Sequence, residues 1–412
     1  MRTILHSDLN CFYASVEMML EPGLRGKAVA VCGDPENRHG IVLTKSQRAK
    51  EAGVKTGMAN WEARQLCPDI IIVPPRYDEY IKYSRLVREI YGRYTDLVEP
   101  FGMDECWLDV TESRCICGSG ADIAEDIRRT VKSELGLTVS VGVSFNKIFA
   151  KLGSDMKKPD AVTVIPADDF KSRIWPLPAG DLLGVGRATE ARLNKRNIRT
   201  IGDIAGADPR NLHIWFGING LKLWRFARGE DTSRVMPSGY EREALSIGHG
   251  ITCYADLLNA GEVRNVLLEL SQGVSHRLRQ AGVAATRIQL YIRGSDLCFT
   301  EYQSRVPFPT QSWRIMTDKA MELFNGRYDW RQPVRALTIR AVGLVDAADP
   351  VQLDLFTDYD AAEKEDALEQ AMDDIRRRFG HGSIQVCSTM RGLKMVKDEA
   401  REQISMPGCM YV

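Results

Sequence analysis

The sequence predicts a multidomain α+β protein, and three observations lead to this class. Its 412 residues exceed one ordinary hydrophobic core, so two to four domains of roughly 100–200 residues each are expected. Short β-branched runs and amphipathic helical patterns are mixed over residues 1–165 and again over residues 242–346. Residues 166–230, which lie between them, carry only short helical patterns.

Composition excludes several classes of protein. Hydrophobic residues make up 44% and charged residues 27% of the chain, which argues against bulk disorder. The sequence has no run of about 18 apolar residues and no secretory signal, so we expect a cytoplasmic protein without a membrane partner. The ten cysteines are scattered and lack CxxC spacing, which favours free thiols over a structural zinc site.

Residues 1–165 alternate strand and helix patterns in a definite order. The first predicted strand stops at Asp8, and a helix follows it after a short gap. A tight turn at Gly102–Glu105 separates two later strands. The predicted strands are Thr3–Ser7, Val29–Cys32, Ile70–Val73, Val98–Phe101, Cys106–Val110 and Thr138–Val143, and the helices are Phe12–Met19, Tyr77–Tyr94 and Ile123–Leu135.

The rest of the chain is divided by composition. Residues 231–241 lack periodicity and contain Pro and Gly, which indicates a linker. Residues 242–346 then combine predicted strands at Thr286–Arg293 and Arg335–Val342 with helices at Glu262–Ala281 and Trp313–Phe324. Residues 347–412 form a C-terminal extension with a predicted helix at Lys364–Phe379.

Charge is distributed unevenly along the chain. The net charge is zero overall, yet residues 166–240 hold 12 basic against 8 acidic residues. Residues 347–374 hold ten acidic residues and one lysine. A neutral average therefore does not exclude a nucleic-acid partner bound by a local basic patch.

Three carboxylates are candidates for catalysis. Asp8 ends the first predicted strand, and Asp104 and Glu105 occupy the turn between two apolar strands. Neighbouring carboxylates repel each other unless a cation lies between them, and hard oxygen ligands suit Mg²⁺. Two such ions about 4 Å apart would activate a primer hydroxyl and stabilise a leaving pyrophosphate. The alternative is that Asp104 and Glu105 form only a polar hairpin turn.

Four motifs together resemble a known family. They read DLNCFYASVE at residues 8–17, FGMDECWLD at 101–109, GVSFNKIFAK at 142–151 and DMKKP at 155–159. Their order and spacing closely resemble the Y-family translesion DNA polymerases of the bacterial DNA polymerase IV type. The resemblance extends from about residue 1 to residue 346.

The resemblance implies a right-hand polymerase fold with a palm, fingers, a helical thumb and an α/β little finger. Residues 1–165 match the palm and fingers, with the fingers at about 20–75, and residues 166–230 match the thumb. Residues 242–346 match the little finger. The implied activity is template-directed addition of dNTPs to a primer, at low fidelity and across damaged bases.

The resemblance also implies roles for individual residues. Asp8, Asp104, Glu105 and the backbone carbonyl of Leu9 match the ligands of two Mg²⁺ ions. Tyr13 matches a steric gate that would clash with a ribose 2′-OH, and Phe12 would pack against the sugar. The implied nucleotide contacts are Phe12, Tyr13, Thr44, Gln47, Lys50 and Lys158.

The chain departs from the family in its fingers. Gln47 and Lys50 stand where the family usually has a Tyr and an Arg on the β- and γ-phosphates. Lysine lacks the bidentate fork of arginine, so we expect phosphate contact with looser geometry. Arg48 or Lys45 is an alternative donor. Gly102 replaces a Ser that is common in front of the Asp-Glu pair.

DNA contacts are expected from two regions. Gly184 and Gly186 lie in an LLGVG element resembling a helix-hairpin-helix, and Arg187 follows it. A packing turn between helices is the alternative. In the little finger the candidates are Arg277, Arg279, Arg287 and Arg293, although several could be solvated surface charges.

Residues Gln352, Leu353, Leu355 and Phe356 resemble a bacterial sliding-clamp motif. They lie in an acidic segment, where exposed Leu and Phe require a packing partner. The alternative is packing against the Lys364–Phe379 helix.

The sequence thus favours a monomeric polymerase that acts on primer–template DNA and dNTPs and has no proofreading exonuclease. Two rivals are a non-catalytic accessory protein that binds DNA and the clamp, and a palm-type nucleotidyl cyclase. The cyclase would not need the thumb, the little finger or the clamp motif, and dependence on a primed template distinguishes it from a polymerase.

Overall fold

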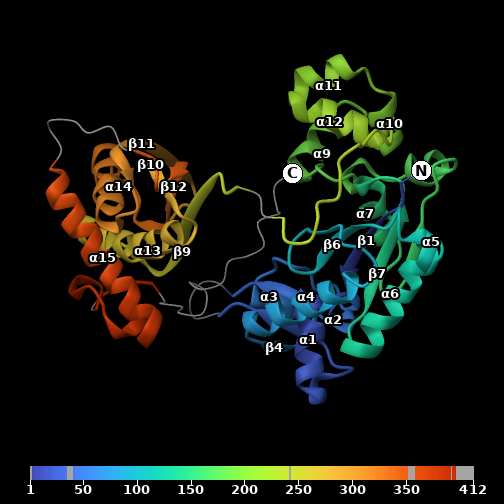
Figure 1. Ribbon diagram of the computed structural model, residues 1–412, viewed down its shortest axis with the longest axis horizontal. Helices are drawn as coiled ribbons and strands as arrows, with labels where there is room; N and C mark the ends of the chain where they lie inside the picture. Colours follow the sequence, from blue (N-terminus) through green and yellow to red (C-terminus); the bar gives the residue numbers. More distant parts are fainter. Residues whose placement is uncertain (1, 35–39, 241–242, 351–357, 391, 396–412) are drawn as a thin grey trace. The chain divides into compact units, whose positions relative to one another are not determined.

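Three β-sheets organise the described part of the chain (Figure 1). The computed structural model describes residues 2–34, 40–240, 243–350, 358–390 and 392–395. Two of the sheets belong to a first unit that takes in residues up to 240, and the third belongs to a second unit that begins at residue 243. Within these ranges, no helix has both the length and the apolar character needed to cross a membrane.

A five-stranded sheet in the order β5-β6-β1-β7-β8 forms the centre of the first unit. Its middle strand, β1 (Ile4–Leu9), is buried along its whole length and runs antiparallel to its two neighbours. The strand predicted over Thr3–Ser7 extends to Leu9, because Asp8 pairs with Glu105 on one side and Ser140 on the other. The other strands are β5 (Val98–Pro100), β6 (Glu105–Asp109), β7 (Val139–Ser144) and β8 (Val162–Val164).

Helices pack against both faces of this sheet. Helices α4 (Tyr77–Tyr91) and α6 (Gly120–Leu135) share one apolar core with Leu5, whereas α7 (Lys147–Met156) packs on the opposite face beside Ile4. Gly142 of β7 permits the close approach of α7, since a Cβ there would lie 1.9 Å from the Ala150 carbonyl oxygen. The end of β1 that carries Asp8 is therefore held firmly between two layers of helix.

A small three-stranded sheet carries the predicted fingers. Its order is β3-β2-β4, from β2 (Val29–Cys32), β3 (Val42–Lys45) and β4 (Ile71–Val73), and it has its own apolar core. Helices α2 (Gln47–Glu51) and α3 (Asn60–Leu66) belong to the same region. The Ser46 hydroxyl caps α2 and accepts a hydrogen bond from the Val29 amide, which ties α2 to the sheet. Helix α1 (Phe12–Leu20) follows β1 and contacts both β2 and β3.

The region after Pro166 is helical, as its sequence indicates. Its short helices enclose a separate core that includes Leu193, Ile201, Leu212 and Leu223. Capping side chains of Thr200 and Asp208 begin two of them, which explains why such short segments form. The helices are α8 (Phe170–Ile174), α9 (Arg187–Asn194), α10 (Ile201–Gly206), α11 (Pro209–Phe216) and α12 (Ile218–Ala227).

The predicted linker packs against the first unit over most of its length. Val235 is buried beside Trp107, and the Met236 amide donates to a carboxylate oxygen of Glu99 at 2.9 Å. The Ser238 amide donates to the Asp96 carbonyl at 2.8 Å. Residues 231–239 are therefore a fixed part of this unit, and the boundary with the second unit falls at residues 242–243.

The second unit is an antiparallel sheet with two helices on one face. The sheet order is β11-β10-β12-β9, and alternate residues of β10, such as Ile288 and Leu290, enter a core shared with α13 and α14. Only part of two of these strands was predicted. The elements are β9 (Ser246–Leu257), α13 (Ala260–Gln280), β10 (Val283–Gly294), β11 (Phe299–Thr310), α14 (Trp313–Arg327) and β12 (Val334–Asp346).

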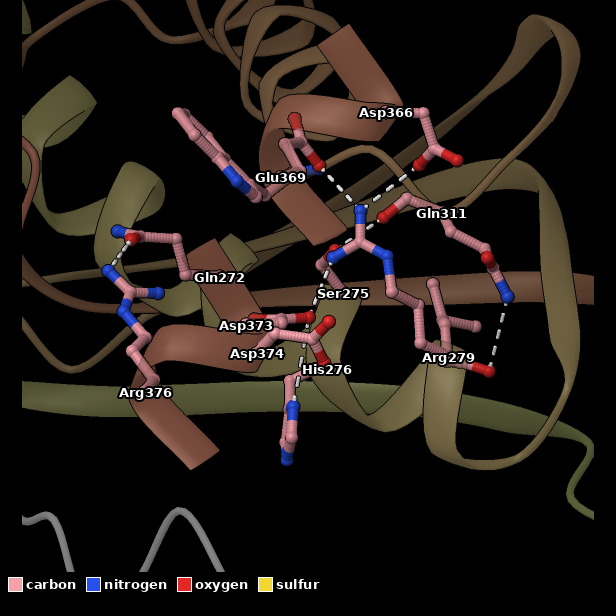
Figure 2. A network of polar contacts seen from close by, with 12 residues as sticks. Gln272, Ser275, His276, Arg279, Gln311, Asp366, Glu369, Asp373, Asp374 and Arg376 are labelled. Atoms are coloured by element: carbon pink, nitrogen blue, oxygen red, sulfur yellow. Dashed lines mark hydrogen bonds and ion pairs between the residues drawn. The ribbon is translucent and has the colours of Figure 1, made fainter. Parts of the chain in front are cut away.

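The C-terminal extension belongs structurally to this second unit. Its helix α15 (Tyr359–Phe379) presents Glu369, which accepts hydrogen bonds from the Trp313 amide and the Ser312 hydroxyl and so caps α14. Figure 2 shows Arg279 of α13 held among the carboxylates of Asp366, Glu369 and Asp373. The expectation that Arg279 contacts DNA is therefore wrong, because the extension already binds its guanidinium group.

Candidate active site

The three predicted carboxylates meet at one end of the central sheet. Asp8 of β1 lies directly opposite Glu105 of β6 in the antiparallel register. Asp104 is the residue before β6, and its carbonyl accepts a hydrogen bond from the Leu9 amide at 2.9 Å. Strand pairing thus brings together residues that are almost one hundred positions apart in the chain.

Burial of these carboxylates is unfavourable for their charged form. It raises the pKa of Asp8 to about 7 and that of Asp104 to about 6, and the neighbouring negative charge of Glu105 adds to both shifts. Burial alone would raise the pKa of Glu105 as well. A hydrogen bond with His6 and the positive charge of Lys151 outweigh this effect and lower the pKa to about 2. The site therefore concentrates negative charge that a cation would stabilise.

Two lysines neutralise part of this charge. The Lys158 ammonium lies 2.7 Å from a carboxylate oxygen of Asp8 and 2.8 Å from one of Asp155. Lys151 of α7 forms an ion pair with Glu105, and the His6 ring lies 3.2 Å from the same carboxylate. No basic side chain among the described residues forms an ion pair with Asp104.

The chemistry of these side chains fits a hard divalent cation. Asp8, Asp104 and the Leu9 carbonyl supply oxygen donors, which Mg²⁺ prefers. In the part of the chain that the structure describes, no group of three or more His, Cys, Asp or Glu residues is arranged to hold a metal ion. The carboxylates of Asp8 and Glu105 form ion pairs with Lys158 and Lys151 instead. A bound cation would therefore share these carboxylates with the two lysines.

A cavity of about 290 Å³ lies beside the carboxylates and next to the small sheet. It brings together most of the predicted nucleotide contacts from three separate stretches of the chain. Its described lining residues are Asp8, Leu9, Asn10, Cys11, Phe12, Thr44, Lys45, Gln47, Lys50, Thr56, Asp104, Lys158 and Pro159. Of the predicted metal and nucleotide ligands, Tyr13 and Glu105 do not line the cavity.

Tyr13 is held beside this cavity by an aromatic cluster. Its ring stacks on the ring of Tyr80 with 4.2 Å between centroids, and Tyr77 meets it edge-on. Its hydroxyl donates to the sulfur of Met103 at 3.3 Å. Phe12 is buried, as a residue that forms a wall of the cavity would be. The structure therefore gives the predicted gate a fixed position.

Sequence reasoning missed several residues of this site. His6 lies on the same face of β1 as Asp8, and period-two alternation along the strand was a signal for it. Asn10 donates to Ser140 and accepts from the Asp160 amide, and so holds the loop that carries Lys158. No local sequence pattern indicated that Thr56 and Tyr80 belong to the site.

The expected DNA contacts are distributed over both units. Gly184 adopts a positive φ of 93° in the turn before α9, Gly186 caps that helix, and Arg187 is its first residue and is exposed. Two nearby arginines, Arg192 and Arg196, pack over the rings of Phe216 and Trp215.

In the second unit, Arg287 of β10 is exposed and lies directly opposite Arg305 of β11. Arg277 belongs to the helix layer, where its guanidinium donates to the carbonyls of Gly248 and Gly273. The expected DNA contact of Arg277 therefore has no support from its position. The predicted clamp motif, Gln352, Leu353, Leu355 and Phe356, lies outside the described residues.

Family models match three stretches of the chain. The model of the impB/mucB/samB family matches residues 7–155, and the model of that family's C-terminal domain matches residues 244–355. Between them, a model described as the DNA polymerase-iota thumb domain matches residues 180–231.

Curated relatives match along nearly the whole length. A DNA polymerase IV of Acetivibrio thermocellus is 46% identical over 383 residues, which cover 93% of this chain and 96% of the relative. DNA polymerase IV 1 of Bacillus subtilis is 36% identical over 391 residues, or 95% and 94% of the two chains. A solved Y-family DNA polymerase chimera, Dbh-Dpo4(243-245)-Dbh, shares the fold with a TM-score of 0.74 at 24% identity, covering 83% of this chain and 99% of that one.

Proposed function

The chain belongs to the impB/mucB/samB family, the Y-family DNA polymerases, and on this premise we propose that it is a translesion DNA polymerase acting on primed templates. It adds dNTPs to a primer 3′-OH, including opposite damaged bases. The observation that carries the proposal is the pairing of Asp8 with Glu105, with Asp104 adjacent, beside a cavity lined by lysines.

Divalent cations belong to this proposal as resident cofactors. Asp8, Asp104, Glu105 and the Leu9 carbonyl would hold two Mg²⁺ ions. Bound there, the ions would supply Lewis-acid stabilisation of the attacking and leaving oxygens. The raised pKa values of Asp8 and Asp104 support this assignment, because buried carboxylates without enough positive charge favour binding of a cation.

The cavity is the proposed nucleotide site. Thr44, Gln47, Lys50 and Lys158 would bind the triphosphate, and Phe12 would pack against the sugar. Tyr13 is the proposed steric gate, whose ring would exclude a ribose 2′-OH. Gln47 donates to Glu51 at 3.1 Å in the structure, so we assign most of the phosphate binding to the lysines.

DNA binding is proposed for the helical region and for the second unit. The amides of the turn at Gly184 and Gly186, with Arg187, would contact backbone phosphates. The side-by-side position of Arg287 and Arg305 supports a polyanion on this face of the sheet, since like charges opposite each other on neighbouring strands are otherwise destabilising.

We further propose that the enzyme lacks a proofreading exonuclease. The palm, fingers, thumb, little finger and extension together account for all the described elements. Without proofreading, fidelity depends on the nucleotide site alone, and low fidelity is expected.

The remaining proposals concern the cellular compartment, the oligomeric state and the protein partner of the enzyme. The enzyme works in the cytoplasm as a monomer that binds the sliding clamp through Gln352, Leu353, Leu355 and Phe356. Replacing both Leu355 and Phe356 by alanine should abolish binding to the purified clamp and leave distributive primer extension intact. Unchanged clamp affinity would contradict this assignment.

Primer extension by the purified protein with Mg²⁺ and dNTPs tests the main proposal. Undamaged and abasic templates are compared, with Asp104→Asn as the active-site variant and Asp78→Asn, an exposed position on α4, as the control. We expect short extension products from the wild type and the control, and a loss of about a thousandfold in Asp104→Asn. If folded wild-type protein binds primed DNA without extending it, the accessory-protein alternative replaces the polymerase.

A further inference from the structure

Lys45 lines the cavity, and the comparisons assign it no role. The sequence offered it, together with Arg48, only as an alternative donor to the phosphates. It is the last residue of β3, immediately before the Ser46 cap of α2. Its side chain is half-buried and lines the cavity together with Lys50 and Lys158. Its ammonium donates a hydrogen bond of 2.9 Å to the hydroxyl of Thr56, which lines the same cavity.

No carboxylate among the described residues forms an ion pair with this ammonium. Burial and the positive charge of Lys50 hold the pKa of Lys45 below its ordinary value. By contrast, Lys158 has Asp8 and Asp155 as partners, and Lys151 has Glu105. A partly desolvated cation that has only a hydroxyl as partner is unfavourable until an anion binds beside it.

The neighbouring side chains do not offer a better donor for such an anion. Arg48 is turned out of the cavity, since its guanidinium donates to the Gly26 carbonyl at 2.7 Å. Gln47 is neutral and donates to Glu51. Lys50 lines the cavity but is more exposed than Lys45. Lys45, which lies just before α2, therefore supplies the positive charge that Gln47 lacks.

We propose that Lys45 is a phosphate-binding residue of the nucleotide site, which acts with Lys50 and Lys158 on the triphosphate of the incoming dNTP. The proposal rests on the proposed function and deepens it. Lys45 thereby compensates for the missing Tyr and Arg of the fingers. Because it is a point charge on a flexible stem, it strengthens binding of the triphosphate without imposing the bidentate geometry of arginine.

Lys45→Met tests this role, because methionine keeps most of the apolar stem and removes the charge. The matched control is Lys27→Met, an exposed lysine of the same small domain that does not line the cavity. Lys45→Arg is the conservative variant that keeps the charge. Single-turnover incorporation gives the dNTP dissociation constant and the maximal rate separately, and inhibition by pyrophosphate gives a second measure of phosphate binding.

In Lys45→Met we expect the dNTP dissociation constant and the inhibition constant of pyrophosphate both to rise about tenfold. Affinity for primed DNA should not change, and Lys45→Arg should recover most of the loss. A Lys45→Met protein that matches Lys27→Met in both constants overturns the inference, as does one that loses DNA affinity alone. Failure of the wild type to incorporate any nucleotide would instead overturn the proposed function.

Discussion

The ring of Tyr80 lies almost parallel to the ring of Tyr13, with 8° between their planes and 4.2 Å between their centroids. The Tyr80 hydroxyl donates to Glu17, which is buried and lies one helical turn after Tyr13 on α1. Arg76 forms an ion pair with the same carboxylate. The proposed gate is thus supported by a second tyrosine, whose hydroxyl is held by a buried glutamate that pairs with Arg76.

This support predicts an effect on sugar discrimination. Tyr80→Leu removes the stack, and stacked aromatic pairs contribute about 0.5–1.5 kcal/mol, so incorporation of ribonucleotides relative to deoxynucleotides should rise up to about tenfold. Tyr80→Phe keeps the ring and should change the ratio much less. Steady-state kcat/KM for dCTP and CTP on one primed template measures the ratio.

Two further variants make this result interpretable. Tyr13→Ala shows whether Tyr13 is a gate at all, and Tyr83→Leu on the same helix controls for damage to α4. If Tyr13→Ala raises ribonucleotide use and Tyr80→Leu leaves the ratio unchanged, stacking by Tyr80 does not position the gate.

Stability of the metal-free protein should depend on pH through the active-site carboxylates. The pKa of Asp104 is about 6 in the folded protein, well above its ordinary value of about 4. The folded state therefore binds a proton that the unfolded chain has already released, and this stabilisation is lost as pH rises through 6. Wild type should lose about 1.4 kcal/mol relative to Asp104→Asn between pH 5 and pH 8, because only about one pH unit of that interval lies below the folded pKa.

Urea unfolding of both proteins in chelator at several pH values checks this expectation. Parallel pH profiles would contradict it. Addition of Mg²⁺ at pH 8 should raise the stability of the wild type more than that of the variant, because a ligand stabilises the folded state in proportion to its affinity for it.

The exposed face of the second sheet should control the salt dependence of DNA binding. Arg287→Gln and Arg305→Gln should each weaken primed-DNA binding and lower the slope of log K against log salt by about 0.9. Arg277→Gln should leave that slope unchanged, since its guanidinium is bound to backbone carbonyls. Fluorescence anisotropy at several salt concentrations measures all three, and a slope change confined to Arg277→Gln would reverse the assignment.

The contact between α15 and the second unit should contribute strongly to stability. Glu369→Ala leaves the partly buried Arg279 without one of its carboxylates and removes the acceptor for the first amide of α14, so we expect a loss of about 3–5 kcal/mol. Asp374→Ala on the same helix removes only an exposed pair with Arg377 and should change stability by less than about 1 kcal/mol. Urea unfolding measures the free energy of unfolding of both variants. Equal losses would show that the network of Figure 2 contributes no more to stability than an exposed ion pair.

Local pattern was sufficient for much of the active site. Asp8 follows the strand pattern of residues 3–7 and Asp104 precedes that of residues 106–110, and strand patterns bounded by turns place such residues near strand ends from sequence alone. The amphipathic helices were predicted to within a few residues for the same reason. Pattern failed at β9 and β11 of the second unit, whose exposed polar residues interrupt the apolar alternation.

The sequence by itself determined the family and predicted the carboxylates of the site and the order of the domains, because motif content and periodicity are local properties of a chain. Only the tertiary structure decided which side chains act together. Arg279 and Glu369 are 90 residues apart, and Tyr80 and Glu17 are 63 apart. Such pairs depend on strand register and helix packing, which no local pattern records, so the contacts of Tyr80 and Arg279 became visible only in the folded protein, and the choice between Lys45 and Arg48 depended on it as well.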